Sequence, residues 1–486
     1  MEGKLDKRWV SRRDFLRLTG LAVGGTILSA CAPAETETKV VKETEVVEVV
    51  TEVTTEVEKV VTATPPPVEE AEIWFAQRGG TDIHYLTLWN DELGPLFEER
   101  HPNIKVEYSP LAGTGPELLE KYLAMFVSGD APDVYTCINE QHNVIMRKGQ
   151  TLDLQPFIDV DLSDEDIADW NPKQLDHFRD ENSWFGLPMY LGNRILIWNK
   201  DIFEAEGEAP PPTSWKDAWT HDEYTEVMGR LCKDEGGERV RWGASVCTRW
   251  PCLNDHLVPY GGNLVDPEDD TKCYLGNPGT QEGLEWLRAR FWDDGYMPVS
   301  SMTEGLVEYQ AFIPQFTATF EGGPWHLRYL ADNAQFKWDL APLPKGPVTI
   351  STTATTDGYL GWSQTKYPSA TWELLKFLSG PDWGKGLART SLLQPARKSL
   401  MDYYITQARI QYPVLEEVNM ELLKEANDMD LGHTYPVYRY HGEALEIIQP
   451  VLEQVFNLGE APVSALADLC DEVEEVQLRM LNQEQG

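Results

Sequence analysis

The sequence predicts an α/β fold in two lobes. Segments with strand-like alternation and segments with helical spacing of apolar residues take turns from residue 72 onward. Strands that are separated by helices pair in parallel, because each helix carries the chain back along the sheet. The chain has 486 residues, which is enough for two hydrophobic cores after an N-terminal segment is set aside.

The N-terminal segment has the order of a bacterial export signal. The basic residues Lys4, Lys7 and Arg8 precede an apolar run over residues 18–30, which ends in small residues. This run is shorter than the roughly 20 apolar residues that cross a bilayer. We therefore predict an export signal over residues 1–30, and the pair Arg12-Arg13 within it resembles the twin-arginine signal.

The apolar run ends in Leu28-Ser29-Ala30-Cys31, which resembles the lipobox of bacterial lipoproteins. In such proteins the cysteine carries several acyl chains, and stable anchoring needs more than one chain. The resemblance implies that Cys31 is lipidated and that the protein is held at the outer, extracytoplasmic face of the cytoplasmic membrane. Residues 31–71 are mostly Val, Thr, Glu, Lys and Pro, and this composition predicts a disordered tether.

Acidic residues outnumber basic ones. There are 80 Asp and Glu against 41 Lys and Arg, and the formal net charge is -39. A surface of this charge repels nucleic acid and anionic lipid, so we expect no nucleic-acid partner and no membrane contact beyond the anchor. The six remaining cysteines allow fifteen disulfide pairings. No Cys-x-x-Cys or His-x-x-x-His spacing indicates a metal or another cofactor.

The first lobe begins with three predicted strands separated by two helices. Apolar and polar residues alternate over 72–75, 104–108 and 132–136, whereas apolar residues recur at helical spacing over 85–97 and 118–127. In open α/β sheets, ligands bind at the loops that follow the carboxyl ends of strands. Asp82 follows the first strand, and Asn139 and Glu140 follow the third, so we predict that they bind ligand. Helix capping or turn formation is an equal alternative for these polar side chains.

Several later segments match a known family in the same order. They are Gly186-Leu187-Pro188-Met189-Tyr190, Ile195-Leu196-Ile197-Trp198-Asn199-Lys200, Glu321-Gly322-Gly323-Pro324-Trp325 and Leu340-Ala341-Pro342-Leu343-Pro344-Lys345-Gly346-Pro347. The series resembles the bacterial extracellular solute-binding proteins of the family that includes maltose-binding protein. One departure is Thr317-Ala318-Thr319-Phe320, which stands where the family has Ala-Met.

The resemblance implies a type II periplasmic-binding-protein-like fold. Each lobe would be a mainly parallel sheet flanked by helices, with hinge crossings near residues 188–190, 355–360 and 394–397. Lobe one would take residues 72–188 plus 357–394, and lobe two residues 189–356 plus 395–486. The family's role implies that a monomer captures a small solute, here expected to be an oligosaccharide or a monosaccharide, and delivers it to the transmembrane subunits of an ABC permease. No cofactor and no catalytic activity are implied.

A sugar needs flat apolar cover together with fixed hydrogen-bonding groups. For stacking, we predict Tyr190, Trp250 and Trp325, and for hydrogen bonding we add Asn193 and Asp357 to the three polar residues named above. Each prediction has a plainer alternative. Trp325 could pack inside lobe two, Tyr190 and Asn193 could serve only the hinge, and Asp357 could only form a turn.

Two rival functions remain open at this stage. An exported carbohydrate-active enzyme such as a glycoside hydrolase would also need a cleft with aromatic residues, and it would add two catalytic carboxylates at a defined separation. The sequence has no Gly-x-Ser-x-Gly nucleophile motif and no metal signature. A structural surface-layer protein would show a fixed-period repeat, and residues 72–486 show none.

Overall fold

The structure, a computed structural model, describes residues 70–80, 82–113, 116–179 and 183–485. The predicted export signal, Cys31 and the predicted tether up to residue 69 lie outside this part of the chain. Within it, no helix is both long enough and apolar enough to cross a membrane.

The first sheet has the strand order β2-β1-β3-β12-β4. Its strands are β1 (Ala71–Arg78), β2 (Ile104–Leu111), β3 (Val134–Cys137), β4 (Leu187–Pro188) and β12 (Gly358–Gly361). β1 pairs in parallel with β2 and with β3, as the alternation of strands and helices predicts. β12 arrives from the other lobe and lies antiparallel to both β3 and β4. The first sheet is therefore mixed.

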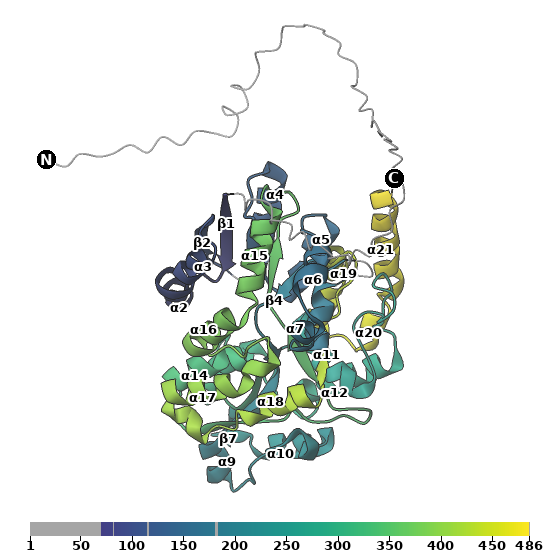
Figure 1. The fold of residues 1–486 in the computed structure, drawn as a ribbon. Coiled ribbons are helices and arrows are strands. Elements are labelled where there is room, and N and C mark those ends of the chain that lie inside the picture. The colour runs from purple at the N-terminus through teal and green to yellow at the C-terminus, as the bar shows by residue number, and fades with distance from the viewer. Residues whose placement is uncertain (1–69, 81, 114–115, 180–182, 486) are drawn as a thin grey trace, which may run out of the picture. The chain divides into compact units, whose positions relative to one another are not determined.

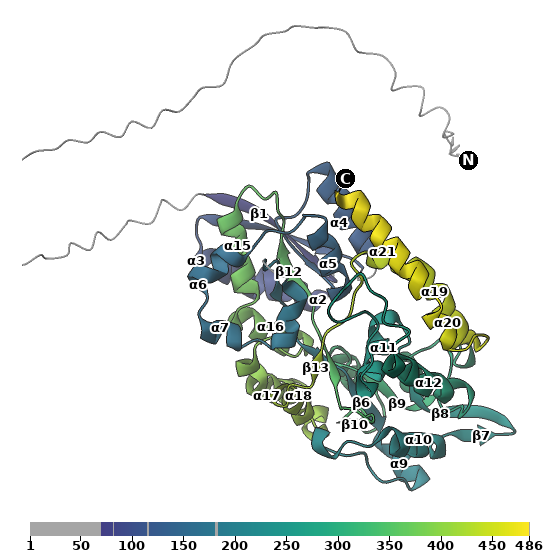
Figure 2. The same cartoon turned by 90° about the vertical axis from the view of Figure 1, so that its right-hand side faces the viewer.

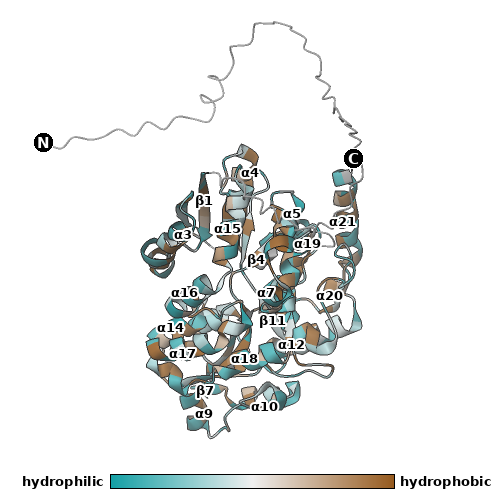
Figure 3. Ribbon diagram, in the orientation of Figure 1, coloured by the Kyte–Doolittle hydropathy of each residue, from teal (hydrophilic) through white to brown (hydrophobic). Residues whose placement is uncertain are grey.

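Helices cover this first sheet. They are α2 (Ile83–Thr87), η1 (Leu88–Leu93), α3 (Gly94–Arg100), α4 (Pro116–Ser128), α5 (Asn139–Arg147), α6 (Gln155–Asp161), α7 (Asp164–Ala168), α8 (Pro172–Leu175), η2 (Asp176–Phe178), α15 (Pro368–Leu378) and α16 (Pro381–Ser391). Figure 3 shows hydrophobic and hydrophilic residues on the same helices, α4 and α15 among them, as expected of helices that cover a core. That core includes the fully buried Tyr135, Trp372 and Trp383.

The second sheet has the strand order β10-β6-β9-β8-β7. Its strands are β6 (Ile195–Asn199), β7 (Lys233–Glu235), β8 (Glu238–Ser245), β9 (Thr317–Gly322) and β10 (Trp338–Ala341). Only β8 and β9 pair in parallel, and the other three pairings are antiparallel. The prediction of a mainly parallel sheet is therefore wrong for this lobe. The strands β6 and β9 are buried on both faces, and burial alone does not determine the direction of pairing.

The second lobe holds the remaining helices. They are α9 (Lys200–Glu206), η3 (Trp215–Asp217), α10 (His221–Arg230), α11 (Trp250–Leu257), η4 (Val258–Tyr260), α12 (Pro278–Trp292), η5 (Ser300–Met302), α13 (Tyr309–Phe312), η6 (Pro324–His326), α14 (Leu327–Asn333), η7 (Lys398–Leu400), α17 (Met401–Gln411), η8 (Pro413–Glu417), α18 (Glu421–Asp428), α19 (His441–Leu452), η9 (Glu453–Leu458), α20 (Ser464–Ala467) and α21 (Cys470–Gln485). Figure 1 shows α21 as the last helix before the C-terminus. Two disulfides cross-link this lobe, Cys247–Cys252 and Cys273–Cys470.

A small third sheet lies where the chain passes between the lobes. It has the order β13-β11-β5, made of β5 (Gly192–Asn193), β11 (Thr352–Thr355) and β13 (Gly432–His433). Figure 2 shows β13 between the sheet that contains β1 and β12 and the sheet that contains β6, β9 and β10. Tyr190 and Pro395 form a further bridge between crossing segments. The crossings therefore tie several separate stretches of chain together.

Each lobe has its own hydrophobic core. The first core draws its buried residues from Ala71 to Met189 and from Tyr359 to Ala396. The second draws most of its residues from Ile195 to Leu343 and from Met401 to Val473, with Ala388 and Leu392 added from α16 and its end. The two-lobed α/β fold is thus confirmed, while the residue boundaries of the lobes stay a prediction.

Candidate functional site

A cavity of about 400 Å³ is lined by residues of both lobes. From the first lobe come Arg78, Tyr85, Ile138, Asp357 and Leu393. Tyr190 and Thr355 belong to the crossing segments, and the second lobe contributes Arg194, Arg249, Glu308, Trp325, His326 and Tyr435. Because no single lobe encloses the cavity, its shape depends on how the lobes approach each other.

An ion pair forms the first-lobe wall. Arg78 is the last residue of β1, and Asp357 lies between β11 and β12. The guanidinium of Arg78 donates to Asp357, and this carboxylate is only 3% exposed. Burial by itself lowers the pKa of Arg78, but the facing Asp357 carboxylate raises it, and the net shift is upward. Both groups are therefore charged, and each compensates the other.

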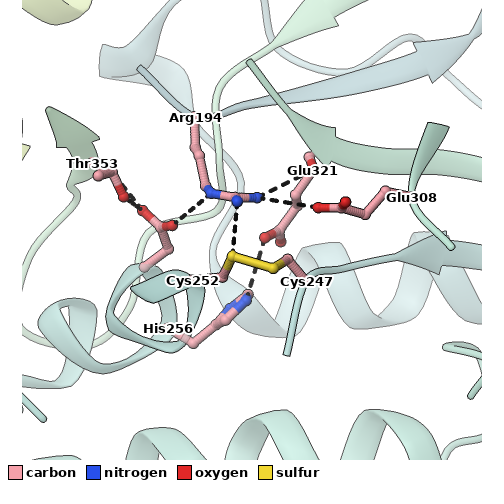
Figure 4. Close-up of a disulfide and its surroundings, with 8 residues drawn as sticks. Arg194, Cys247, Cys252, His256, Glu308, Glu321 and Thr353 are labelled. Carbon is pink, nitrogen blue, oxygen red and sulfur yellow. Dashed lines mark hydrogen bonds and ion pairs between the residues drawn. A yellow bond between two sulfur atoms is a disulfide. The ribbon is translucent and has the colours of Figure 1, made fainter. Parts of the chain in front are cut away.

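A second buried arginine forms the opposite wall. Arg194 lies between β5 and β6 and is 3% exposed. Its Nε lies 3.2 Å from Asp255 Oδ2, and its Nη1 lies 3.7 Å from Glu308 Oε1. Figure 4 shows the Arg194 guanidinium at the centre of this cluster, with Glu308 and Glu321 on one side. Burial lowers the pKa of Arg194, but Tyr435 and Asp255 raise it by more, so the net shift is upward and the side chain stays charged.

Aromatic side chains supply flat surface to the cavity. Trp325 lies in η6 of the second lobe, yet its indole packs against the first-lobe core. This position depends on Gly192 in β5, because a Cβ there would lie 2.6 Å from Cζ3 of Trp325. Tyr190 lies at the crossing itself, and burial raises the pKa of its hydroxyl well above its usual value. The phenol is therefore neutral and can both donate and accept a hydrogen bond.

The structure places Tyr190, Trp325 and Asp357 in the cavity wall, and their contact with a ligand stays a prediction. It places Trp250 elsewhere. This side chain is 2% exposed, its Nε1 donates to the carbonyl oxygen of Pro436 at 3.1 Å, and its ring packs on Tyr438. The position does not support the predicted stacking role, because Trp250 is the first residue of α11 and its side chain enters the second-lobe core.

The position of Asn193 also does not support its predicted role, which was to form a hydrogen bond with the ligand. It is 1% exposed, donates through Nδ2 to the carbonyl oxygen of Thr353 at 3.2 Å, and accepts from Nε2 of Gln394 at 3.1 Å. Asn193 is not among the residues that line the cavity. Its bonds join three crossing segments, which is the plainer alternative stated for it.

Asp82 has two partners in the structure. Its carboxylate accepts from the backbone N–H of His84 at 2.9 Å and so caps α2. It also pairs at 2.9 Å with Arg328, which belongs to α14 of the second lobe. Asp82 thus joins the two lobes and does not line the cavity. Asn139 and Glu140 begin α5 directly after β3, and their side chains lie outside the described part of the structure.

Sequence reasoning missed the arginines and two tyrosines of the wall. Arg78 ends β1, next to the loop that the strand rule singles out, so its position offered a signal. Arg194, Arg249, Tyr85 and Tyr435 carried no motif. His326 also lines the cavity, and burial, helped by Arg194, lowers its pKa to about 3. Within the described ranges, no group of three or more His, Cys, Asp or Glu side chains could hold a metal ion.

The chain resembles known proteins over most of the described region. The family model described as bacterial extracellular solute-binding protein matches residues 85–385. A Bacillus subtilis protein named maltodextrin-binding protein is 24% identical over 245 residues, which is 49% of this chain and 54% of that protein. A Brucella abortus protein named as a binding protein is 23% identical over 330 residues, 65% of this chain and 75% of that protein.

Solved structures show the same fold at low sequence identity. An ABC substrate-binding protein of Listeria monocytogenes in complex with cycloalternan has a TM-score of 0.70 and 20% identity, and the match covers 85% of this chain and 100% of that chain. The sugar-binding protein MalE of Xanthomonas citri has a TM-score of 0.67 and 20% identity, with the same coverage. At this identity the likeness concerns the fold alone.

Proposed function

Because the chain belongs to the bacterial extracellular solute-binding protein family, we propose that it captures a carbohydrate outside the cytoplasmic membrane and delivers it to an ABC-type permease. The resemblance drawn from the sequence motifs is thereby confirmed at the level of the family. The observation that carries the proposal is the cavity shared by the two lobes, with Trp325 and Tyr190 beside paired charges.

The chemistry of the cavity wall suits a neutral, hydroxyl-rich ligand. Flat rings can cover the apolar face of a sugar, while charged groups make strong hydrogen bonds to hydroxyls. Arg78 and Arg194 are each balanced by a carboxylate within the wall. A neutral ligand therefore leaves both ion pairs intact and finds fixed donors and acceptors around it.

From the N-terminal sequence features, we propose that this receptor is held at a membrane. Lipidation at Cys31 would anchor the chain at the outer face of the cytoplasmic membrane, and residues 31–71 would hold the lobes away from the lipid. We expect a monomer there, since one chain contributes both walls of the cavity. Mass spectrometry of the membrane fraction tests the anchor directly, because acylation adds the mass of the fatty chains to the peptide that begins at Cys31.

A thermal-shift screen with a panel of sugars tests the binding proposal. A sugar that binds only the folded state raises the unfolding midpoint by mass action. The Trp325→Ala variant should weaken binding of that sugar by about 1–3 kcal/mol, because it removes a stacking surface. The midpoint of the unliganded variant should stay almost unchanged. A large fall in that midpoint would show that Trp325 is a packing residue.

An exported glycoside hydrolase is the alternative activity. Both carboxylates that line the cavity, Asp357 and Glu308, pair with arginines, and this arrangement supports binding more than acid–base chemistry. Prolonged incubation with oligosaccharides followed by product analysis separates the two functions. Saturable binding without products supports the receptor, and release of shorter sugars would support the enzyme.

A further inference from the structure

We infer that the Cys247–Cys252 disulfide is a positioning element of the ligand cavity, which holds Arg249 and Pro251 in the cavity wall and fixes Arg194 beside them. This inference rests on the proposed function, because it concerns the same cavity. It assigns to two cysteines a role in ligand affinity that differs from general stabilisation of the fold.

The disulfide closes a very short loop next to the cavity. Cys247 follows the end of β8, and Cys252 lies in the first turn of α11, five positions further along the chain. Between them, Arg249 and Pro251 line the cavity. Both wall residues therefore lie inside a ring of backbone that the sulfur–sulfur bond completes, and their freedom to move is limited by that ring.

Arg249 depends on this loop for its position. Its side chain is exposed, and within the described part of the chain it makes no ion pair or hydrogen bond. Arg78 and Arg194, in contrast, are each fixed by a carboxylate. Arg249 is thus held through its backbone alone, with Trp250 as the neighbouring anchor in the second-lobe core. A loop that opens would move Arg249 with nothing at its side chain to resist.

The same disulfide also contacts the second buried arginine. Nη2 of Arg194 lies 2.8 Å from Sγ of Cys252. Figure 4 shows the sulfur–sulfur bond beside the guanidinium, between Arg194 and His256. The Cys252 sulfur is buried, so it fills the space below the guanidinium that Asp255 and Glu308 hold from the sides. The disulfide therefore acts on two parts of the wall: it closes the loop that carries Arg249, and it contacts the guanidinium of Arg194.

The second disulfide provides a matched control within the same lobe. Cys273 and Cys470 are 197 positions apart and join the segment before α12 to the start of α21. Neither cysteine lines the cavity. Any effect that comes from losing a disulfide in general should appear for both pairs, whereas an effect on the cavity should appear only for Cys247 and Cys252.

The experiment compares two double variants, Cys247→Ser with Cys252→Ser, and Cys273→Ser with Cys470→Ser. Affinity for maltotriose and the unfolding midpoint are measured for each by titration calorimetry and thermal unfolding. Loss of the short loop should weaken maltotriose binding about tenfold, because preorganisation of the wall is lost, and should lower the midpoint less than loss of the long link does. Loss of the long link should lower the midpoint and leave the affinity within about twofold.

Hydrogen exchange of the unliganded protein gives a readout that needs no sugar. Amides over residues 247–254 and around Arg194 should exchange faster when the short loop is opened, while amides around β7 should not change. Arg249→Gln keeps the disulfide and should weaken maltotriose binding at an unchanged midpoint. Unchanged amide exchange in the opened-loop variant would overturn the inference. So would an unchanged affinity of that variant for maltotriose when the wild type binds this sugar. Failure of the wild type to bind any sugar would count against the proposed function alone.

Discussion

The two lobes share a design but differ in how they are held together. Each contains a five-stranded sheet flanked by helices. The first-lobe core includes fully buried rings such as Trp170, Trp372, Trp383 and Tyr135. Both disulfides that the structure describes belong to the second lobe. The comparison teaches that the second lobe adds covalent links, one across 197 positions and one across five, whereas the first lobe relies on packing and on the buried Arg78–Asp357 pair.

The largest effect should come from the long cross-link. Replacing Cys273 and Cys470 with Ser should lower the free energy of unfolding by about 5 kcal/mol, because the link restricts an unfolded loop of 197 positions. Opening the Cys247–Cys252 loop should lower it by only about 2 kcal/mol, because the loop is short. Denaturant unfolding of both variants measures the two losses. Equal losses in the two variants would show that the loop-closure entropy of the unfolded chain does not set the contribution of each disulfide.

The next largest effect concerns the buried pair of the first lobe. Arg78→Met leaves the Asp357 carboxylate buried without its cation, so the free energy of unfolding should fall by about 3–5 kcal/mol. Arg230→Met is the matched control, because Arg230 pairs with Glu208 at the surface, where loss of an ion pair should cost less than about 1 kcal/mol. Urea unfolding of the two variants gives the comparison. Similar small losses would mean that Asp357 is not buried as a charge.

Acidification should destabilise both lobes through neutral buried histidines. Burial lowers the pKa of His142 to about 3 and of His177 to about 4 in the first lobe, and those of His221 and His326 to about 3 in the second. The unfolded chain binds more protons than the folded one below the usual histidine pKa of about 6.5. Stability is therefore lost as the pH falls from about 6.5 toward 4, by about 1.4 kcal/mol per pH unit for each histidine.

His256 should act in the opposite direction. Burial lowers its pKa, but the Glu321 carboxylate at 3.3 Å outweighs burial, so the net shift is upward. Its contribution is present at low pH and is lost as the pH rises through the folded-state pKa.

Thermal unfolding of the wild type and of the His142→Asn variant between pH 4 and 7 measures the slope of stability with pH that the neutral histidines produce. An unchanged slope in the variant would contradict a neutral, buried His142.

The smallest effect should come from the contact between the lobes. The Asp82–Arg328 pair is partly exposed, with side-chain exposures of 33% and 27%. Asp82→Asn should therefore lower the free energy of unfolding by less than about 1 kcal/mol. Asn at position 82 can still cap α2, so the loss reports the ion pair alone. A fall well above this range would show that the contact between the lobes contributes more than a partly exposed ion pair.

The sequence predicted elements and family motifs better than it predicted the cavity wall. Trp325 was predicted from a matched motif and Asp357 from a predicted hinge crossing, and both line the cavity. Arg194 was missed because a single buried arginine between two strands leaves no periodic pattern. Trp250 was assigned to the cavity because its surroundings look like a loop, whereas α11 begins there and turns the indole into the core.

Pairing information was the other part that the sequence could not provide. The strands β6, β9 and β10 lie on or beside segments matched to the family, but their antiparallel order depends on long connections through other helices. The Cys273–Cys470 disulfide joins positions that are 197 residues apart and become neighbours only after folding. Both are contacts distant in sequence, and the local spacing of residues carries no record of them.

Hydrogen exchange with and without a saturating sugar tests the central claim most directly. If both lobes close around one solute, amides over residues 78–87 of the first lobe and over residues 322–327 of the second should gain protection together. The gain should disappear in the Trp325→Ala variant at the same sugar concentration. Protection confined to one lobe, or none at a concentration that saturates binding, would contradict a cavity that both lobes share.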